Sequence, residues 1–321
     1  HWFPSWSPPP WSKPWRASPS PRPDRPLPDA LDLIDAILRI APFNVRLRSP
    51  MRGVEDHVRR FYAHARREHR ADAFVDFDIQ ILPGTGMRRW LGPQARFLLD
   101  GLEPFLPLPA AQAGPLFEWG LNWAIASRPL GYLVLHAAVL ARGKEAIVLP
   151  GFPGAGKSTL CAALMLIDGW RLLSDELAIL DPATGRLLPN PRPISLKNAS
   201  IDIVKRFPGA ALGPIYLDTR KGTITHASAS ADSVASAEQA AICRWVVFPS
   251  FSTGEAPYRE RITRAEAFAL ISEQSFNKER MGETGFHALC AMLDAAGCHQ
   301  IGYGSTEEGL DTIRSLCSEP A

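Results

Sequence analysis

Long apolar runs are missing from this chain of 321 residues. A helix that spans a membrane needs about 18 or more consecutive apolar residues, and no such stretch occurs in the sequence. Residues 1–28 also lack the apolar centre of a signal peptide, because proline interrupts them throughout. We therefore expect a cytoplasmic protein with no membrane partner.

An excess of charge of one sign is missing as well. The formal net charge is only +2, whereas proteins that bind the phosphate backbone of nucleic acids carry clustered Lys and Arg side chains. We therefore expect no nucleic-acid partner.

Cysteine is scarce and scattered along the chain. The five cysteines stand at positions 161, 243, 290, 298 and 317, and no CxxC pair occurs among them. An odd number without paired spacing argues against a disulfide framework and against a zinc site. Reduced thiols, mostly buried as small apolar side chains, are the expected state.

Proline, by contrast, is abundant in residues 1–28, which also contain four Trp. Proline at this density prevents helix and sheet formation and favours an extended, solvated chain. We expect a disordered tail here, with a recognition segment for an aromatic-lined groove as the alternative.

The apolar pattern changes character near residue 131. Before this point, apolar residues at helical spacing predict helices over residues 29–40, 54–69 and 113–127. Alternation of apolar and polar residues predicts a strand over residues 74–82. We expect residues 29–130 to form an α+β region that packs on the rest of the chain.

Beyond this point, strands and helices alternate. The predicted order is strand, strand, helix, strand, over residues 132–141, 146–150, 157–168 and 170–180. Shorter elements follow, and helices over 264–277 and 285–297 close the chain. Strands joined through a helix after a Gly-rich loop predict an α/β core, over residues 131–321, with a mixed and at least partly parallel central sheet.

A phosphate-binding loop lies between a buried strand and a helix in this core. Residues 151–158 match G-x-x-x-x-G-K-[ST] at each fixed position. Glycine lets the backbone curl with its N–H groups around a phosphate, and the following helix adds the positive end of its dipole. Lys157 would reach the β- and γ-phosphates, and Ser158 would hold Mg²⁺. The residues expected to bind the nucleotide are Gly151, Gly154, Ala155, Gly156, Lys157, Ser158 and Thr159.

Two further polar positions flank this loop in the sequence. Asp175 and Glu176 lie inside an apolar strand pattern, where carboxylates are costly to bury unless a cation such as Mg²⁺ compensates. We expect both to bind the metal together with Ser158, and edge carboxylates facing water are the alternative. His136 lies on the strand before the loop strand, so it is expected near the phosphates unless it is a hydrogen-bonded core histidine.

Sequence elements that mark other classes of protein with phosphate-binding loops are absent. No LSGGQ-type sequence occurs, which argues against an ABC ATPase, and no N-K-x-D element occurs, which argues against a GTPase switch. A loop followed one helix later by an acidic pair fits a phosphotransferase better.

Together these motifs resemble the HPr kinase/phosphorylase family, and more closely its branch called HprK-related kinase A. The resemblance covers roughly residues 75–305 of the chain. It rests on six blocks in the same order, which are EWGLNWAIA, LHAAVL, LPGFPGAGKSTLCAAL, GWRLLSDELAIL, PNPRPISLKNASI and DTRKGTITH.

The resemblance implies a P-loop core of the phosphoenolpyruvate-carboxykinase-like type with a mixed central sheet. It implies ATP and Mg²⁺, with transfer of the γ-phosphoryl group to a serine hydroxyl, in the parent family on a small carrier protein. By position, Asp175 matches the general base, Glu176 matches a metal ligand and His136 matches the histidine beside the base. Lys157 and Ser158 match the functional residues of the loop.

The chain also departs from the parent family. The second acid is Glu rather than Asp, the block that positions the carrier protein has no recognisable equivalent, and the N-terminal part does not resemble the parent's separate domain. These departures leave the acceptor, the reverse phosphorylase reaction and the hexameric assembly unassigned. A homo-oligomer is compatible with the resemblance.

A kinase of this kind usually needs a further cation on the acceptor side. The candidates are Arg192 and Lys197, which flank PISL, and Lys221 in DTRKG; surface charge is the alternative for each. The expected function is ATP-dependent phosphorylation of a serine in a small protein or peptide partner. A small-molecule kinase and a non-catalytic nucleotide-sensing module on the same core are the alternatives.

Overall fold

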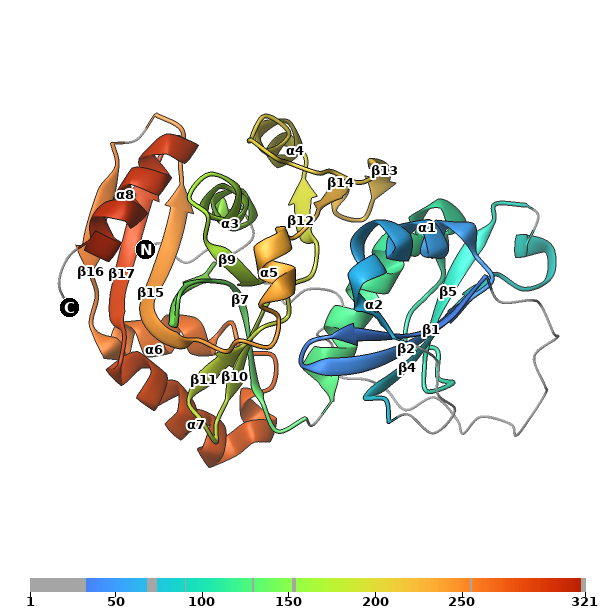
Figure 1. The fold of residues 1–321 in the computed structure, drawn as a ribbon, viewed down its shortest axis with the longest axis horizontal. Coiled ribbons are helices and arrows are strands. Elements are labelled where there is room, and N and C mark those ends of the chain that lie inside the picture. The colour runs from blue at the N-terminus through green and yellow to red at the C-terminus, as the bar shows by residue number, and fades with distance from the viewer. Residues whose placement is uncertain are drawn as a thin grey trace.

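The computed structural model describes residues 33–67, 74–89, 91–128, 130–151, 154–254 and 256–318. The proline-rich segment 1–28 lies outside the described residues. The fold is mixed α/β, with three β-sheets and helices packed on them (Figure 1). Within the described residues, no helix combines the length and the apolar character needed to cross a bilayer. All five cysteines are free thiols.

A six-stranded sheet occupies the N-terminal part of the described chain, which we call the N-terminal lobe. The strand order is β3-β1-β2-β4-β5-β6, and only β2 and β4 run parallel among the neighbouring pairs of the described strands. The elements are β1 (Ile34–Ile40), β2 (Phe43–Ser49), α1 (Arg52–Phe61), η1 (Ala63–Ala65), β3 (Arg66–Arg67), β4 (Phe77–Pro83), η2 (Gly86–Arg89), β5 (Gln94–Leu99), β6 (Leu108–Pro109), η3 (Ala110–Gln112) and α2 (Ala113–Ser127). Helices α1 and α2 cover the sheet and share its apolar core.

The helix predicted over residues 29–40 is wrong, because residues 34–40 form strand β1. Ile34, Ala36 and Leu38 follow the period of two of a strand, and they join the apolar core of the N-terminal lobe. β1 pairs with β2 along its full length and with β3 on its other side. This pairing satisfies the backbone of β1 and overrides the helical spacing. The helix predicted over 113–127 is confirmed as α2.

An eight-stranded sheet forms the centre of the remaining chain, which we call the core lobe. The strand order is β11-β10-β7-β8-β15-β17-β16, and β9 also pairs with β7. β15 runs parallel to β8 and to β17, while the other pairs are antiparallel, so the sheet is mixed as predicted. Its strands are β7 (Leu133–Arg142), β8 (Glu145–Pro150), β9 (Arg171–Ser174), β10 (Leu177–Asp181), β11 (Arg186–Leu188), β15 (Ile242–Phe251), β16 (Tyr258–Arg261) and β17 (Gly297–Tyr303).

Strand β7 is buried on both faces of this sheet. Ala138 and Leu140 pack with α3 (Lys157–Leu166) and α8 (Thr306–Ser318) on one face, whereas Ala137 and Val139 pack with α6 (Arg264–Ser272) and α7 (Lys278–Asp294) on the other. Figure 1 shows the two helix pairs on opposite sides of the strands. Burial of both faces explains why the sequence of β7 reads as a nearly continuous apolar run.

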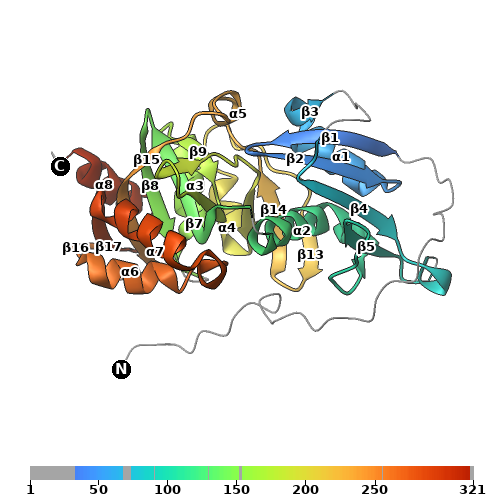
Figure 2. The same cartoon turned by 90° about the horizontal axis from the view of Figure 1, so that it is seen from below.

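A small three-stranded sheet lies beside helix α2, at the boundary between the lobes (Figure 2). Its order is β12-β14-β13, with both pairs antiparallel. The elements of this segment are β12 (Ile194–Lys197), α4 (Ala199–Val204), β13 (Tyr216–Thr219), β14 (Gly222–Ala227) and α5 (Ala231–Ala235). Leu196 joins the core around α3, and Tyr216 approaches Gly114 at the start of α2. The small sheet therefore connects the two lobes.

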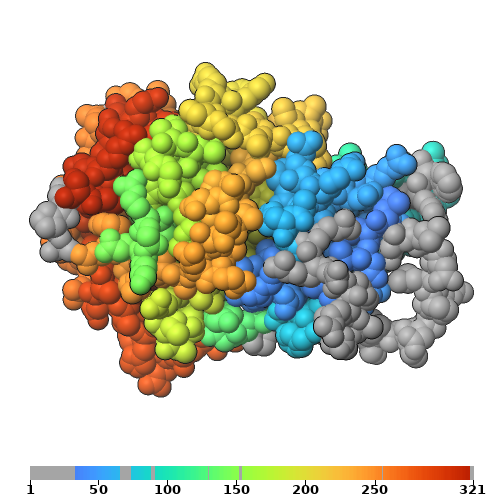
Figure 3. Space-filling model, in the orientation of Figure 1, coloured from blue at the N-terminus to red at the C-terminus, as the bar shows by residue number. Residues whose placement is uncertain are grey.

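The two lobes meet along a continuous surface (Figure 3). Arg39 on β1 forms a two-pronged ion pair with Glu238 of the core lobe, at 3.0 and 3.1 Å. Asn190 of the core lobe donates a hydrogen bond to the carbonyl of Ala41 at 2.7 Å. Charged and amide side chains therefore help to dock the lobes.

The strand predicted over residues 170–180 is interrupted at Asp175 and Glu176. β9 pairs with the later half of β7, and β10 pairs with the earlier half, where Leu177 lies opposite His136. The acidic pair is therefore held in the break between two strands, beside the strand that carries His136.

Candidate functional site

Two glycines of the loop between β8 and α3 have left-handed backbone conformations. Gly154 and Gly156 take φ angles of +93° and +79°, which a residue with a Cβ rarely adopts. At Gly156 there is also no room, because a Cβ would fall 2.6 Å from Tyr303 Oη and 2.9 Å from Phe251 Cβ. The ends of β15 and β17 thus press on the loop just before α3 begins.

Lys157 opens helix α3, and its side chain is buried towards strand β7. Its Nζ lies 3.2 Å from Nε2 of His136. The Lys157 charge, together with burial, lowers the pKa of His136 to about 3, so His136 is neutral near pH 7. The Nε2 atom of a neutral ring can accept a hydrogen bond from the Lys157 ammonium group, and the ring's own hydrogen is then on Nδ1. Burial lowers the pKa of Lys157, against the attraction of Asp175 and Glu176.

Asp175 is buried next to the first turn of α3. Its Oδ2 accepts hydrogen bonds from Ser158 Oγ at 3.3 Å and from the backbone N–H of Ser195 at 3.1 Å. Its Oδ1 has no hydrogen-bond partner among the described residues. Burial raises the pKa of Asp175 above its ordinary value, although Lys157 opposes the shift. One oxygen of this carboxylate is therefore held, and the other is free to accept a proton.

Glu176 is held from the opposite direction, by helix α2. It accepts a hydrogen bond from Nδ2 of Asn122. Burial alone would raise the pKa of Glu176, but Lys221 and Lys197 outweigh burial and hold this pKa well below its usual range. Glu176 is therefore ionised, while its neighbour Asp175 is the more basic carboxylate. Two titratable groups with pKa values pushed apart suit two different roles.

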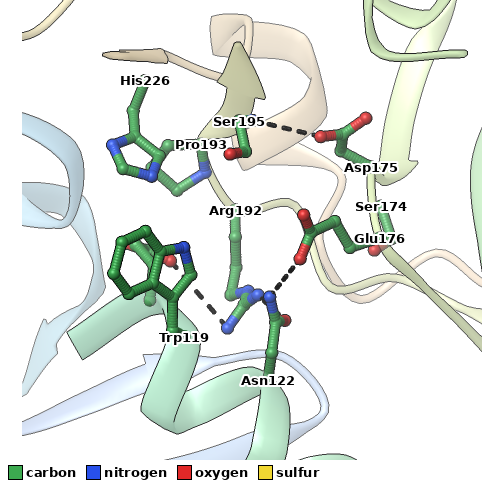
Figure 4. Close-up of a pocket in the computed structure, with 10 residues that line it drawn as sticks. Trp119, Asn122, Ser174, Asp175, Glu176, Arg192, Pro193, Ser195 and His226 are labelled. Atoms are coloured by element: carbon green, nitrogen blue, oxygen red, sulfur yellow. Dashed lines mark hydrogen bonds and ion pairs between the residues drawn. The ribbon is translucent and has the colours of Figure 1, made fainter. Parts of the chain in front are cut away.

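A chain of hydrogen bonds and one ion pair leads from Glu176 into the N-terminal lobe (Figure 4). Oδ1 of Asn122 accepts from Arg192 Nη2, and Arg192 Nη1 lies 3.9 Å from Glu118 Oε2. Glu118 accepts from the Tyr62 hydroxyl at 2.8 Å and is also bound to His57 Nε2 at 2.7 Å. Helix α2 thus faces the acidic pair with a row of polar groups.

The residues predicted from the sequence meet in this region, although they come from five separate segments. His136, Lys157, Ser158, Asp175 and Glu176 are joined by the contacts above. Among the three acceptor-side candidates, Arg192 reaches Asn122 and Glu118. Lys221 Nζ lies 5.4 Å from the centre of the Trp119 ring. The charge of Lys197 helps to lower the pKa of Glu176. Gly151, Ala155 and Thr159 lie in the loop and the first turn of α3 without a polar contact to the acidic pair.

Glu118 and Asn122 were not predicted as site residues. Both belong to α2, whose other positions are mostly apolar and buried. Residues four apart lie on one face of a helix, so two polar side chains at this spacing within a buried helix were a usable signal. Their partner Arg192 could not be identified from spacing alone, because it lies 70 residues away from Asn122 in the sequence.

The acidic pair and Ser158 offer oxygen atoms of the kind that Mg²⁺ binds. No group of three or more His, Cys, Asp and Glu side chains suited to a metal occurs in the part of the chain that the structure describes. Mg²⁺ bound with nucleotides usually takes only one or two carboxylates from the protein. Ser158, Asp175 and Glu176 fit this description. The unpartnered Oδ1 of Asp175 could bind such an ion or accept a hydrogen bond from a hydroxyl.

Comparison with known proteins adds no relative to these observations. A scan against protein-family models and a search of curated proteins found no match to this chain. The functional assignment therefore depends on the residues of the site.

Proposed function

We propose that this chain is an ATP-dependent kinase that transfers the γ-phosphoryl group to a serine hydroxyl of a small protein or peptide. The observation that carries the proposal is the contact between Asp175 and Ser158, directly beside buried Lys157 at the start of α3. It joins a group suited to accept a proton with a loop suited to hold phosphates. The proposal includes a P-loop core of the HPr kinase type in residues 131–321, as the sequence motifs suggest.

The donor half of the reaction uses the loop and the start of α3. Backbone N–H groups of the loop, the dipole of α3 and the ammonium of Lys157 hold and neutralise the phosphates of ATP. Neutral His136 fixes the lysine side chain by its contact at 3.2 Å. Mg²⁺, bound by Ser158 and Glu176 with Asp175 beside it, would neutralise charge on the transferring group.

The acceptor half uses Asp175 as the general base. Its Oδ2 is fixed by Ser158 and by the N–H of Ser195, which leaves Oδ1 to accept the proton of the acceptor hydroxyl. Burial makes this carboxylate more basic than an exposed aspartate. A nucleotide sensor has no use for such a base, so the arrangement favours catalysis over sensing.

The test uses ATP labelled on the γ-phosphate, Mg²⁺ and candidate acceptor proteins. We expect Lys157→Ala to weaken ATP binding about tenfold or more, because it removes the buried ammonium group that would bind the phosphates. Asp175→Asn should retain ATP binding but slow transfer about 100-fold or more, as expected for loss of a general base. The matched controls are Lys144→Ala and Asp311→Asn, which change exposed side chains outside the site.

The outcome of the labelling separates the candidate functions. Label on an acceptor protein supports the proposal, whereas label only on small solutes indicates a small-molecule kinase. Transfer by Asp175→Asn at the parent rate contradicts the assignment of the base. ATP binding that is unchanged in Lys157→Ala contradicts the assignment of the loop.

A further inference from the structure

The carboxyl ends of three strands of the core lobe meet beside the loop that precedes α3. β8 leads into this loop, and β15 runs parallel to β8 on one side and to β17 on the other. Phe251 and Tyr303 are the last residues of β15 and β17, and they lie opposite each other in register. Figure 1 shows β15 ending next to α3 and α8. Ligands of α/β sheets bind outside the carboxyl ends of parallel strands, so this edge is a place to look for one.

The two aromatic side chains at this edge differ in exposure. Tyr303 is only 4% exposed, belongs to the apolar core around α3 and donates its hydroxyl to the carbonyl of Ala155 at 3.4 Å. The ring of Phe251 lies 5.7 Å from the ring of Tyr303, measured between ring centres, yet Phe251 is 40% exposed. Tyr303 therefore supports the loop from below, whereas part of Phe251 stays open to solvent.

Phe251 borders the loop directly. A Cβ on Gly156 would fall 2.9 Å from Phe251 Cβ, so the Phe251 side chain starts at the surface of the loop. A single exposed Phe is ordinary on a protein surface. Next to a loop with a phosphate-binding sequence it has a specific use, because a nucleotide held by that loop also carries an aromatic base. The position of Phe251, rather than its exposure alone, thus indicates a ligand.

The other side of the loop is occupied by groups suited to the reacting phosphate. β7 is the neighbour of β8 on the side away from β15. His136 on β7 contacts Lys157, and Asp175 contacts Ser158. Under the proposed function, the γ-phosphate points towards these groups. The base is at the opposite end of a nucleotide, which places it on the side of β15 and β17, where Phe251 lies.

The side chains that follow these strands limit what the site can distinguish. Ser252 and Thr253 follow β15, and Ser305 lies just beyond the end of β17. A hydroxyl group can both donate and accept a hydrogen bond, so it does not select the amino edge of adenine over the carbonyl edge of guanine. Stacking on an aromatic ring accepts every base, and a purine buries more apolar area than a pyrimidine. These properties favour purines without separating adenine from guanine.

We infer that Phe251 is the stacking platform for the base of a purine nucleotide whose phosphates occupy residues 151–158, and that GTP binds there about as well as ATP. The inference rests on the proposed function for the place of the phosphates. It adds a binding residue from another strand, and a base specificity that the loop sequence does not define.

Calorimetric titration of the full chain with Mg²⁺ measures the base specificity without relying on catalysis. The ligands are non-hydrolysable analogues of ATP, GTP and CTP. We expect the ATP and GTP analogues to bind with affinities within about threefold of each other, and about fivefold or more tighter than the CTP analogue. Equal affinity for the CTP analogue, or a larger difference between the ATP and GTP analogues, would overturn the inference.

Two variants test the aromatic ring itself. Phe251→Leu keeps an apolar side chain but removes the ring, whereas Phe251→Trp keeps a ring. Phe251→Leu should weaken binding of the ATP analogue about fivefold or more, with unchanged affinity for inorganic tripolyphosphate, which has no base. Phe251→Trp should retain the affinity for the ATP analogue. An equal loss for tripolyphosphate would show that the loop, rather than the base contact, had changed, and would contradict the role of Phe251.

The matched control for these variants is Phe286→Leu. Phe286 is also exposed, at 51%, and packs against Phe268 of α6, on the face of the sheet opposite α3. Its substitution should leave the affinity for the ATP analogue unchanged. A loss in Phe286→Leu equal to that in Phe251→Leu would indicate a general structural effect and overturn the assignment.

The inference and the proposed kinase function fail in different ways. Purine binding that is weakened in Phe251→Leu, without phosphate transfer to any acceptor, would contradict the kinase and leave Phe251 assigned. Phosphate transfer by Phe251→Leu with the KM for ATP and the rate of the parent protein would contradict the role of Phe251 and leave the kinase standing.

Discussion

Asp175 and Glu176 are adjacent in the sequence, but their surroundings shift their pKa values in opposite directions. Asp175 is buried against Ser158 and Ser195, and its pKa is raised. Glu176 lies among Lys221, Lys197 and the amide of Asn122, and its pKa is lowered despite burial. The side chains around each acid, rather than the acid itself, thus raise the pKa of one carboxyl group and lower that of the other.

Asn122 should control the use of Mg²⁺ through Glu176. Its Nδ2 donates to Glu176, and its Oδ1 is held by Arg192. Asn122→Ala frees the Glu176 carboxylate to rotate, and losing a group that orients a metal ligand typically costs about tenfold or more in metal affinity. We therefore expect the Mg²⁺ concentration for half-maximal phosphate transfer to rise about tenfold. Steady-state transfer rates measured over a series of Mg²⁺ concentrations test this.

The matched control for this prediction is Asn190→Ala. Asn190 also donates its amide across the lobe boundary, to the carbonyl of Ala41 at 2.7 Å, but it does not contact Glu176. The Mg²⁺ dependence should stay unchanged in this variant even where its stability falls. An equal rise in both variants would show that lobe docking, rather than the orientation of Glu176, sets the metal dependence.

At the scale of elements, the ends of β15 and β17 leave no room for a side chain at Gly156, in the loop between β8 and α3. Gly156→Ala would place a methyl group 2.6 Å from Tyr303 Oη, at a φ angle of +79°. We expect ATP affinity to fall about tenfold or more, because the loop must shift to relieve the clash and its N–H groups lose their alignment. Titration with a fluorescent ATP analogue measures the loss.

Gly143→Ala separates this clash from backbone strain alone. Gly143 lies in the turn between β7 and β8 with a φ angle of +60°, and a Cβ there meets nothing within 4 Å. Its substitution should cost about 1 kcal/mol of stability and leave ATP affinity unchanged. Unaltered ATP affinity in Gly156→Ala would mean that the loop does not bind the nucleotide in this conformation.

Elements with a strong local pattern were predictable from the sequence, and elements that depend on partners were less so. Helix α2 was predicted to the residue, and β7, β8 and α3 were placed in the right order. β1 was predicted as a helix, because its apolar residues satisfy both periods and only its pairing with β2 and β3 decides between them. The break at Asp175 was likewise set by pairing with β7.

The residues of the site likewise differ in how far the sequence could predict them. His136, the loop and the acidic pair were predicted as neighbours, since adjacent strands and the helix between them limit where they lie. The contribution of α2 was not predicted, because Asn122 meets Glu176 only after two lobes have docked. Contacts between lobes leave no periodic signal in the sequence, apart from polar residues in an otherwise buried helix.

At the scale of the whole molecule, the boundary between lobes contains buried ionisable groups. His226 on β14 lies 5.5 Å from His57 of α1, measured between ring centres, and near Glu118 and Arg192. Burial lowers the pKa of His226 to about 4, although Glu118 and Glu176 oppose the shift. The folded protein therefore keeps this ring neutral at pH values where the unfolded chain already binds a proton.

The stability of the protein should consequently fall as the pH falls from 6.5 towards 4. In this window the unfolded state binds a proton at His226 and the folded state does not, so the free energy of unfolding decreases as the pH drops. Between pH 7.5 and pH 5, the parent protein should lose about 2 kcal/mol more stability than His226→Gln. His136, whose pKa is about 3, acts in the same direction but remains in both proteins. Urea unfolding at the two pH values measures the difference.

His287→Gln is the control for this prediction, because His287 is exposed and its ion-pair partner Glu283 is exposed as well. This variant should lose as much stability as the parent protein between the two pH values. If His226→Gln also loses as much as the parent, His226 titrates alike in the folded and unfolded states. The lobe boundary would then admit water to this ring, and burial would not keep His226 neutral in the folded protein.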